Sequence, residues 1–312
     1  MAAQLTVLYV AESTRGLAWQ KQIQQDSPNI RFYVWPEDTV DLASVDILVM
    51  WRIPQALLSQ LTNLKAIFTV SAGIDQLDIK TIPEHIDIIR MIDDDLSDQL
   101  AEYSVMSVLM LYRQAFEYLD QQTKHQWQKF KLPPANTINI GLMGLGHQGQ
   151  KIIQALRPFG FNLLGWSRSQ HKIHGVSCYD AHHLEQFLSQ LNILICVLPL
   201  TKQTDGILNR QLLNQLPKGS SIINIGRGKH LIIDDLIECL DSGHIHRAII
   251  DVMANEPLEV DSCLWDHPKI FVTPHIAGDT RAESGYRTLL TSITTWVDGG
   301  EPKGLVPRTR GY

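Results

Sequence analysis

Three short apolar runs in the second half of the sequence each end beside side chains that can take part in chemistry. The runs are residues 222–225, 248–250 and 270–272, and they lead in order into Arg227, into Asp251 with Glu256, and into His275. In an open parallel sheet, ligands bind at the carboxyl ends of the strands. A cation, two carboxylates and an imidazole at successive strand ends therefore predict a single site.

These groups suit the reduction of a carbonyl by a nicotinamide. That reaction needs a proton donor beside the carbonyl oxygen and a positive group that polarises the carbonyl or holds an acid group. His275 fits the first role and Arg227 the second, while a hydrogen bond to Glu256 would hold the imidazole tautomer and keep it protonated. Each residue also has a structural alternative. His275 could be a hydrogen-bonded structural histidine at a strand end, Arg227 could anchor a phosphate, and Glu256 could lie in a surface turn.

The composition is that of an ordinary globular protein. The chain has 312 residues, 44% hydrophobic and 19% charged, which is enough for two domains. The net charge is -6 with acids and bases interspersed, so we expect small-molecule partners and neither nucleic acid nor membrane. The four cysteines follow no disulfide or zinc pattern, so we expect no metal and take the cytoplasm as the default location.

The order of segments predicts two doubly wound domains. Strand-like and helix-like stretches alternate at residues 6–11, 17–25, 31–35, 46–51, 55–61, 65–70 and 86–91, and again between 137 and 272. Such alternation predicts parallel sheets with crossover helices. A widely apolar helix over 97–121 divides the two blocks, and a last helix over 287–297 is expected to return to the first domain.

We therefore expect an α/β fold with two Rossmann-like or flavodoxin-like parallel-sheet domains and a crevice between them. Residues 1–98 with 284–312 would form the substrate-binding domain, and residues 99–283 would form the dinucleotide-binding domain.

A glycine-rich turn lies between a predicted strand and a predicted helix. It reads Gly144-Leu145-Gly146-His147-Gln148-Gly149. A G-x-G-x-x-G is a weak signal alone, but in this context it permits a tight turn and a pyrophosphate at the helix amino end. The sequence therefore predicts dinucleotide binding.

The end of the next predicted strand indicates the form of that dinucleotide. An NAD site carries an acid about 20 residues after the glycines, whereas this chain has Trp166-Ser167-Arg168 there. A guanidinium and a hydroxyl suit a 2′-phosphate, which an acid would repel. We expect NADPH, with NADH as a weaker alternative, and the structural alternative is that Arg168 is a solvated loop residue.

Together these motifs resemble the signatures of the D-isomer-specific 2-hydroxyacid dehydrogenases. The resemblance covers nearly the whole chain and rests on the glycine turn, residues 224–228, Asp251-Val252, Glu256-Pro257-Leu258 and residues 273–278. Within that family the chain is most similar to the glyoxylate/hydroxypyruvate reductase A group, through Trp51, residues 71–75, residues 99–103, the Trp166-Ser167-Arg168 turn and the closing Arg310-Gly311-Tyr312.

The resemblance implies that the protein reduces glyoxylate or hydroxypyruvate with NADPH. His275 would be the general acid/base, Glu256 its partner, and Arg227 the group that binds the substrate carboxylate and carbonyl. Cofactor contacts would come from Gly144, Leu145, Gly146, Gly149, Ser167, Arg168, Leu198, Pro199, Thr204, Ile225, Gly226 and Asp251, the last at the nicotinamide amide. Substrate contacts would come from Trp51, Arg52, Ala72, Gly73 and Arg227, and the helix from about Ser97 would form a homodimer interface.

Several alternatives stay open at this point. Arg52 would favour a substrate with a second anionic group, or it is a solvated loop residue. Another 2-hydroxyacid dehydrogenase that uses NADH fits the same motifs. Formate-type relatives are disfavoured, because they pair the histidine with an amide and this chain has Glu256. A dinucleotide-sensing binding protein, like some transcriptional corepressors of the family, could retain the full set of site residues.

Overall fold

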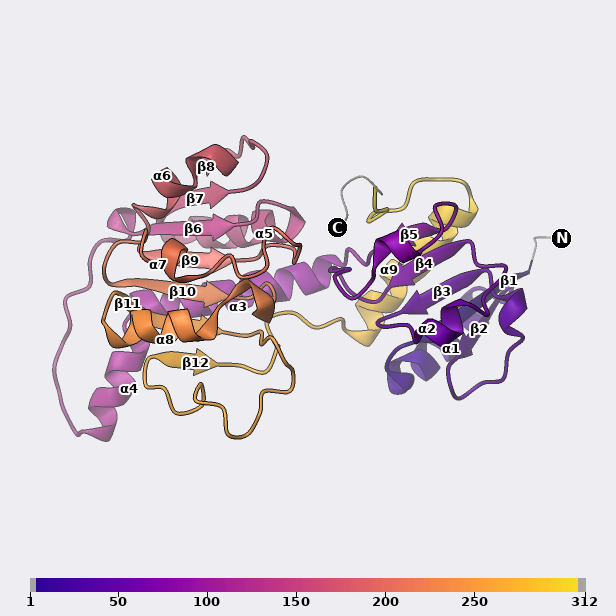
Figure 1. Cartoon of the computed structure of the whole chain (residues 1–312), viewed down its shortest axis with the longest axis horizontal. Coiled ribbons are helices and arrows are strands. Elements are labelled where there is room, and N and C mark those ends of the chain that lie inside the picture. Colours follow the sequence, from indigo (N-terminus) through magenta and orange to yellow (C-terminus); the bar gives the residue numbers. More distant parts are fainter. Residues whose placement is uncertain (1–3, 308–312) are drawn as a thin grey trace. The chain divides into compact units, whose positions relative to one another are not determined.

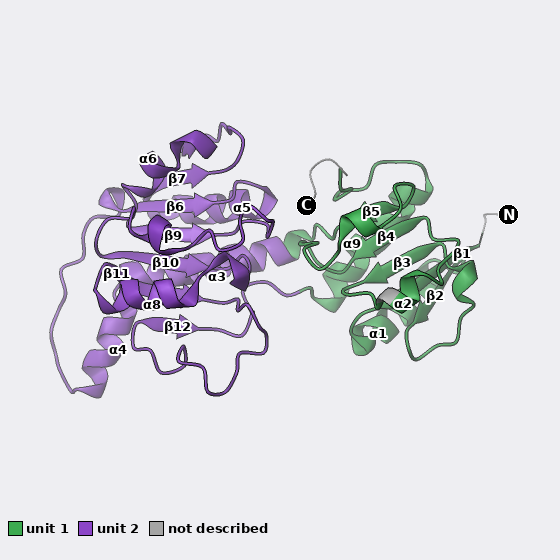
Figure 2. Cartoon of the chain, viewed as in Figure 1, with its two compact units in different colours: residues 1–95, 280–312 green, residues 96–279 purple. Residues whose placement is uncertain are grey.

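The chain folds into two α/β units (Figure 1; Figure 2). The computed structural model describes residues 4–307, without the side chain of Gln55, so Arg310 to Tyr312 lie outside the described residues. The first unit comprises residues 1–95 and 280–312, and the second comprises residues 96–279. These junctions fall a few residues before the ones expected at 98–99 and 283–284.

The first unit is built on a parallel sheet with the strand order β2-β1-β3-β4-β5. Its strands are β1 (Leu5–Val10), β2 (Ile30–Val34), β3 (Ile47–Met50), β4 (Ala66–Thr69) and β5 (Asp87–Ile89). Its helices are α1 (Ser13–Asp26), α2 (Gln55–Leu58) and α9 (Ala282–Val297), with 3-10 turns at Leu42–Ser44 and Ile79–Thr81. β3 and β4 are buried along their whole length, which is typical of parallel strands covered on both faces.

Helices and loops cover both faces of this first sheet. Trp19 and Ile23 of α1 pack with Tyr286 and Ile293 of α9 on one face. The other face is covered by a second cluster that includes Leu57 of α2 and the apolar residues that follow it. Trp19 Nε1 donates a hydrogen bond of 2.6 Å to the carbonyl oxygen of Ala282, so the last helix is joined directly to the first.

The second unit holds a longer parallel sheet with the order β12-β11-β10-β9-β6-β7-β8. Its strands are β6 (Asn139–Met143), β7 (Asn162–Trp166), β8 (Ser177–Tyr179), β9 (Ile193–Cys196), β10 (Ser220–Asn224), β11 (Ile245–Ile250) and β12 (Ile270–Val272). Its helices are α3 (Asp94–Tyr112), α4 (Ala115–Thr123), α5 (His147–Leu156), α6 (Leu184–Leu188), α7 (Arg210–Leu213) and α8 (Ile233–Asp241); the first two residues of α3 are assigned to the first unit. Short 3-10 turns lie at Ala135–Thr137, Arg157–Phe159, Ala181–His183 and Gly228–His230.

This second sheet is also covered on both faces. Apolar side chains of α3 and α5 form a core with one face, and those of α6, α7 and α8 form a core with the other. The expected fold class, two parallel-sheet α/β domains, is confirmed.

The prediction of a single helix over residues 97–121 was wrong. The structure divides it into α3, which ends at Tyr112, and α4, which begins at Ala115. Between them Gln114 has a φ of 56°, and a left-handed residue cannot continue a right-handed helix. The apolar pattern runs through this point without a break, so it carries no sign of the turn.

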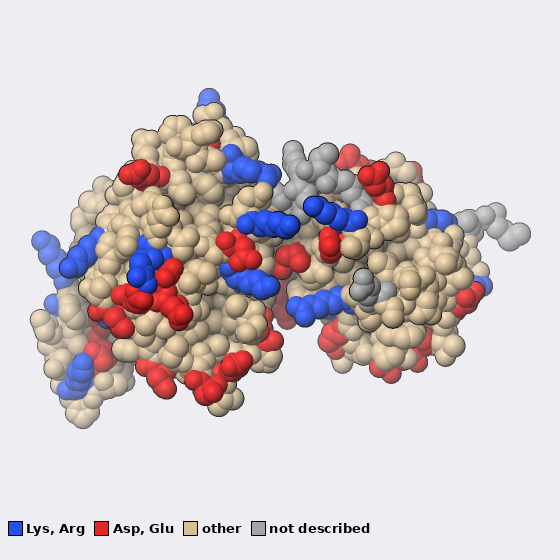
Figure 3. Space-filling view, viewed as in Figure 1, with Lys and Arg blue, Asp and Glu red and all other residues tan. Residues whose placement is uncertain are grey.

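In the part of the chain that the structure describes, no helix combines the length and the apolar character needed to cross a membrane. On the face shown in Figure 3, the Lys and Arg side chains of each unit lie interspersed with Asp and Glu.

Candidate active site

Three adjacent strands of the second unit deliver the groups singled out in the sequence. Asn224 of β10 is paired with Ile250 of β11, and Ile250 is paired with Val272 of β12. Because the strands are parallel and in register, Arg227, Asp251 and His275 all follow the same edge of the sheet. The structure thus brings the three strand-end loops together.

His275 and Glu256 form a hydrogen-bonded pair. The His275 Nδ1 atom lies 2.7 Å from Glu256 Oε2, and the two side chains are 37% and 36% exposed, so a small molecule can reach them. The second carboxylate oxygen, Glu256 Oε1, accepts a hydrogen bond of 2.9 Å from the backbone N–H of Met253. Glu256 is therefore fixed at both oxygens, and the imidazole is left with Nε2 for other partners.

Asp251 is buried below this pair and holds the loop that carries His275. It is 1% exposed. Its Oδ1 accepts hydrogen bonds from Thr273 Oγ1 at 2.6 Å and from the Ile276 N–H at 2.8 Å, and its Oδ2 accepts one from the Ala277 N–H at 2.9 Å. These three bonds hold the Asp251 carboxylate to the segment on both sides of His275.

The loop with Arg227 is fixed by two residues that sequence reasoning did not single out. Asn224 Nδ2 donates to the carbonyl oxygen of Arg227 at 3.1 Å, and the Arg227 N–H donates to His230 Nδ1 at 3.0 Å. Both Asn224 and His230 are fully buried. Asn224 carried a readable signal, since it is a polar residue inside an apolar run. The half-buried Arg227 side chain donates from Nη1 to the carbonyl oxygen of Gly226 at 2.9 Å.

The glycine turn joins β6 to α5, as its sequence context indicates. Gly144 has a φ of 115°, and a Cβ there would lie 2.8 Å from the carbonyl oxygen of Val197. A Cβ on Gly149 would collide with the carbonyl oxygen of Gly144, so both positions require glycine. Around Gly146, by contrast, a Cβ would meet nothing within 4 Å. Open space over the amino end of α5 fits a pyrophosphate.

The neighbouring strand β7 places further predicted cofactor residues at this edge. β7 pairs with β6, and after its last residue Trp166 come the buried Ser167 and the exposed Arg168. Ser167 Oγ donates to the carbonyl oxygen of Ser169 at 2.6 Å, which fixes this turn. Arg168 thus follows the strand next to β6, the strand that leads into the glycine turn.

The loop after β9 emerges next to the other side of the glycine turn, because β9 lies between β6 and β10. Leu198 is 8% exposed, and Thr204 Oγ1 donates to the carbonyl oxygen of Pro199 at 2.7 Å. Ile225 and Gly226, from the β10 loop, are buried. The predicted cofactor residues of the second unit thus follow one sheet edge.

The substrate residues predicted in the first unit follow the carboxyl ends of its neighbouring strands β3 and β4. Trp51 and Arg52 are exposed directly after β3. Ala72 and Gly73 are half-buried after β4, in a turn where Ser71 Oγ donates to the carbonyl oxygen of Gly73 at 2.7 Å. Their contact with substrate stays a prediction.

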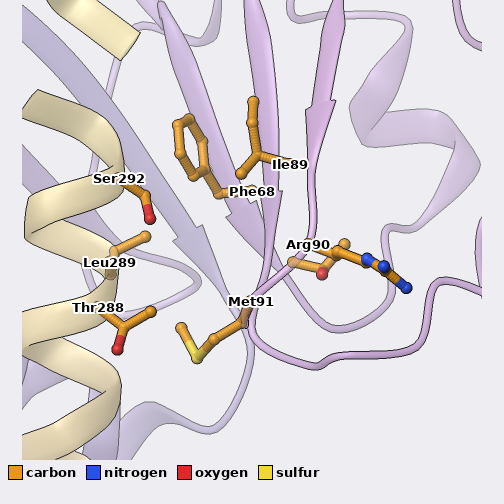
Figure 4. Close-up of a pocket in the computed structure, with 8 residues that line it drawn as sticks. Phe68, Ile89, Arg90, Met91, Thr288, Leu289 and Ser292 are labelled. Atoms are coloured by element: carbon orange, nitrogen blue, oxygen red, sulfur yellow. The ribbon is translucent and has the colours of Figure 1, made fainter. Parts of the chain in front are cut away.

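A small pocket in the first unit is lined by none of these residues (Figure 4). Its volume is about 10 Å³, which is room for about one water molecule. It lies between α9 and the ends of β4 and β5 and is lined by Phe68, Thr69, Ile89, Arg90, Met91, Thr288, Leu289 and Ser292. In residues 4–307, no group of three or more His, Cys, Asp or Glu side chains is arranged to hold a metal ion.

Comparisons with known proteins found a family model and several solved structures that are similar to this chain. The family model described as D-isomer specific 2-hydroxyacid dehydrogenase, NAD binding domain, matches residues 105–277. A solved structure of a D-isomer specific 2-hydroxyacid dehydrogenase family protein from Klebsiella pneumoniae 342 is 34% identical, with a TM-score of 0.88 and 99% of each chain covered.

Two further solved structures were determined with a dinucleotide. The NADPH-dependent glyoxylate/hydroxypyruvate reductase from Sinorhizobium meliloti, in complex with NADP and sulfate, is 30% identical, with a TM-score of 0.91, covering 99% of this chain and 100% of that chain. A D-isomer specific 2-hydroxyacid dehydrogenase from Xanthobacter autotrophicus Py2, in complex with NADPH and MES, is 29% identical, with a TM-score of 0.92 and 100% of both chains covered.

Proposed function

Because the chain belongs to the D-isomer-specific 2-hydroxyacid dehydrogenase family, we propose that it is an NADPH-preferring reductase of glyoxylate and hydroxypyruvate. Glyoxylate would give glycolate, and hydroxypyruvate would give glycerate. The observation that carries the proposal is the 2.7 Å bond between His275 and Glu256, at the same sheet edge as Arg227. A similar reductase from Sinorhizobium meliloti supports this choice of substrates.

Each residue of this site has its own role in the reduction. When bound, NADPH supplies the hydride to the carbonyl carbon of the substrate. His275 holds a proton on Nε2 and delivers it to the carbonyl oxygen, while Glu256 accepts the Nδ1–H and stabilises the charged imidazole. The guanidinium of Arg227 binds the substrate carboxylate and polarises the carbonyl.

Arg168 and Ser167 would select NADPH over NADH. An exposed Arg168 in a turn fixed by Ser167, after the strand next to the glycine turn, supports a site for a 2′-phosphate, which needs a cation and hydrogen-bond donors. NADP and NADPH in the two similar structures support this preference. Asp251 would contact the nicotinamide carboxamide.

A substrate panel with both cofactors tests the proposed function. We expect NADPH oxidation with glyoxylate and hydroxypyruvate, and a lower kcat/KM with NADH for both. Tight NADPH binding without turnover of any 2-ketoacid would overturn the proposal and favour a dinucleotide sensor.

We further propose that the protein is a homodimer that uses α3, α4 and the segment after them. Six large apolar side chains there are between 37% and 97% exposed: Met106, Tyr118, Leu119, Trp127, Phe130 and Leu132. Such a concentration of exposed apolar area favours an interface. Glu117 Oε1 accepts from Arg247 Nη2 at 3.1 Å, so α4, which carries Tyr118 and Leu119, is fixed to β11.

A cytoplasmic location also remains part of the proposal. All four cysteines are free thiols, which is typical of proteins in a reducing compartment.

A further inference from the structure

His275 has a backbone conformation that a residue with a Cβ adopts only under constraint. Its φ is 56°, in the left-handed region. Strained conformations of this kind persist only where the surrounding structure holds them, and they are common at functional sites. The groups that hold His275 are therefore candidates for a role in the reaction.

Asp251 provides the constraint from both its backbone and its side chain. Its carbonyl oxygen accepts a hydrogen bond of 2.8 Å from the His275 N–H. Its carboxylate accepts the next two backbone N–H groups, those of Ile276 and Ala277. Because Asp251 is 1% exposed, water does not compete for these bonds. The peptide groups on both sides of His275 are thus tied to one buried residue.

The same carboxylate is the end of a longer hydrogen-bond chain. Thr273 Oγ1 lies 2.6 Å from Asp251 Oδ1 and 2.6 Å from the hydroxyl of Tyr103 on α3. An ionised carboxylate only accepts, so the Thr273 proton points to Asp251 and the Tyr103 hydroxyl must donate to Thr273. Hydrogen bonds linked in this way strengthen one another in a buried environment.

Tyr103 is suited to be a permanent donor. It is 6% exposed. Burial is the main cause that raises the pKa of Tyr103 to about 12; the hydroxyl of Thr273 opposes the rise, the nearby Asp251 carboxylate adds to it, and the hydroxyl of Ser107 opposes it. The hydroxyl is therefore protonated near neutral pH.

We propose that Tyr103 is a positioning residue for His275, acting through Thr273 and Asp251 to hold the left-handed turn that presents the imidazole. The inference rests on the proposed function, in which His275 delivers the proton. Tyr103 reaches His275 only through the two intervening residues, so it orients the acid and does not react itself.

The variant Tyr103→Phe tests this role, because it removes the hydroxyl and nothing else. Tyr112→Phe is the matched control: Tyr112 lies on the same helix, and its hydroxyl donates to the carbonyl oxygen of Pro133 at 2.8 Å, outside the chain to Asp251. We expect kcat to fall about tenfold in Tyr103→Phe, as one hydrogen bond is lost, with KM for the ketoacid within about twofold. Tyr112→Phe should leave kcat unchanged.

A second readout does not depend on turnover. The imidazole resonances of His275, identified by their loss in His275→Gln, should shift in Tyr103→Phe and stay in place in Tyr112→Phe. If the wild-type protein reduces no 2-ketoacid, the proposed function fails while these resonances still decide the role of Tyr103. Unchanged resonances and unchanged kcat in Tyr103→Phe would overturn the inference.

Thr273→Val interrupts the same chain at its middle and keeps the test decisive if Tyr103→Phe does not fold. It should also shift the His275 resonances; unmoved resonances would count against the chain. The double variant should lose no more than about the larger single loss, because the two hydroxyls act in series. Independent, multiplying losses would show that Tyr103 does not act through Thr273.

Discussion

The pairing of His275 with Glu256 decides which nitrogen of the imidazole can act on a substrate. Nδ1 is committed to Glu256 Oε2, and Glu256 Oε1 is committed to the Met253 N–H. A carboxylate fixed at both oxygens holds the ring plane and stabilises the protonated ring. An amide in place of Glu256 would keep the orientation but not the charge stabilisation.

Loss of either central residue should abolish most of the catalysis. We expect His275→Ala and Arg227→Ala each to lower kcat/KM by at least about two orders of magnitude, since one removes the proposed proton donor and the other the proposed carboxylate-binding cation. Steady-state kinetics with glyoxylate and NADPH measure the effect. His246→Ala is the control, because His246 also pairs with a glutamate, Glu117, at 3.1 Å. Near-normal turnover by both site variants would refute the assignment.

The choice of cofactor should depend on Arg168. Arg168→Asp should raise KM for NADPH about tenfold or more while sparing NADH, because a carboxylate would face the 2′-phosphate in place of a guanidinium. The measurement is the KM for both cofactors. Lys218→Asp makes the same charge change just before β10, at the amino edge of the sheet, and should alter neither value. Equal changes for both cofactors in Arg168→Asp would contradict this role.

At the scale of the elements, strand order accounts for how much of the site the sequence predicts. Apolar runs followed by polar groups, and glycines at a strand-to-helix turn, are local patterns. The sequence alone therefore predicts the functional residues that follow β6, β10, β11 and β12. Their adjacency follows from doubly wound topology. The Tyr103–Thr273 bond has no such signal, because it joins residues 170 positions apart and Tyr103 also fits an ordinary apolar helix face.

A buried carboxylate at the start of β3 joins three segments of the first unit. Asp46 Oδ2 accepts from the Thr6 N–H of β1 at 2.9 Å. Its Oδ1 accepts from Asn63 Nδ2 at 2.9 Å and from Lys65 Nζ at 2.8 Å. Burial raises the pKa of Asp46, but the bonds from Lys65, Thr6 and Asn63 together lower it by more than burial raises it. The pKa therefore lies below its ordinary value.

The stability of the protein in acid should therefore depend on Asp46. A carboxyl with a lowered folded-state pKa stabilises the fold above its unfolded pKa of about 4, and this contribution is lost as the pH falls towards the folded value. Asp46→Asn should lower the free energy of unfolding at pH 7 by about 1–3 kcal/mol and reduce its decline below pH 4. Urea unfolding across pH measures both. Glu84 is exposed, so Glu84→Gln should change neither the free energy of unfolding at pH 7 nor its decline below pH 4. If the stability of Asp46→Asn declined in acid as much as that of the wild type, the role of Asp46 would be disproved.

At the scale of the whole molecule, the exposed apolar side chains of residues 106–132 should determine the oligomeric state. Trp127 is 97% exposed, so Trp127→Glu would place a charge in the proposed interface and should shift the protein towards monomer in sedimentation experiments. Val260 is equally exposed and lies in another loop, so Val260→Glu should leave the assembly intact. A monomeric wild type, or a dimer indifferent to Trp127→Glu, would refute this interface.

The return of α9 to the first unit has a consequence for biosynthesis. The second unit is an insertion within the first, whose core needs Tyr286, Leu289 and Ile293 as well as β1 and α1. Domains fold as units while the chain leaves the ribosome. The residues of the insertion emerge complete before α9 is made, so until then α1 covers this face of the amino-terminal strands without α9. The second unit is thus expected to fold first, and the first unit to complete its core only after α9 has been made.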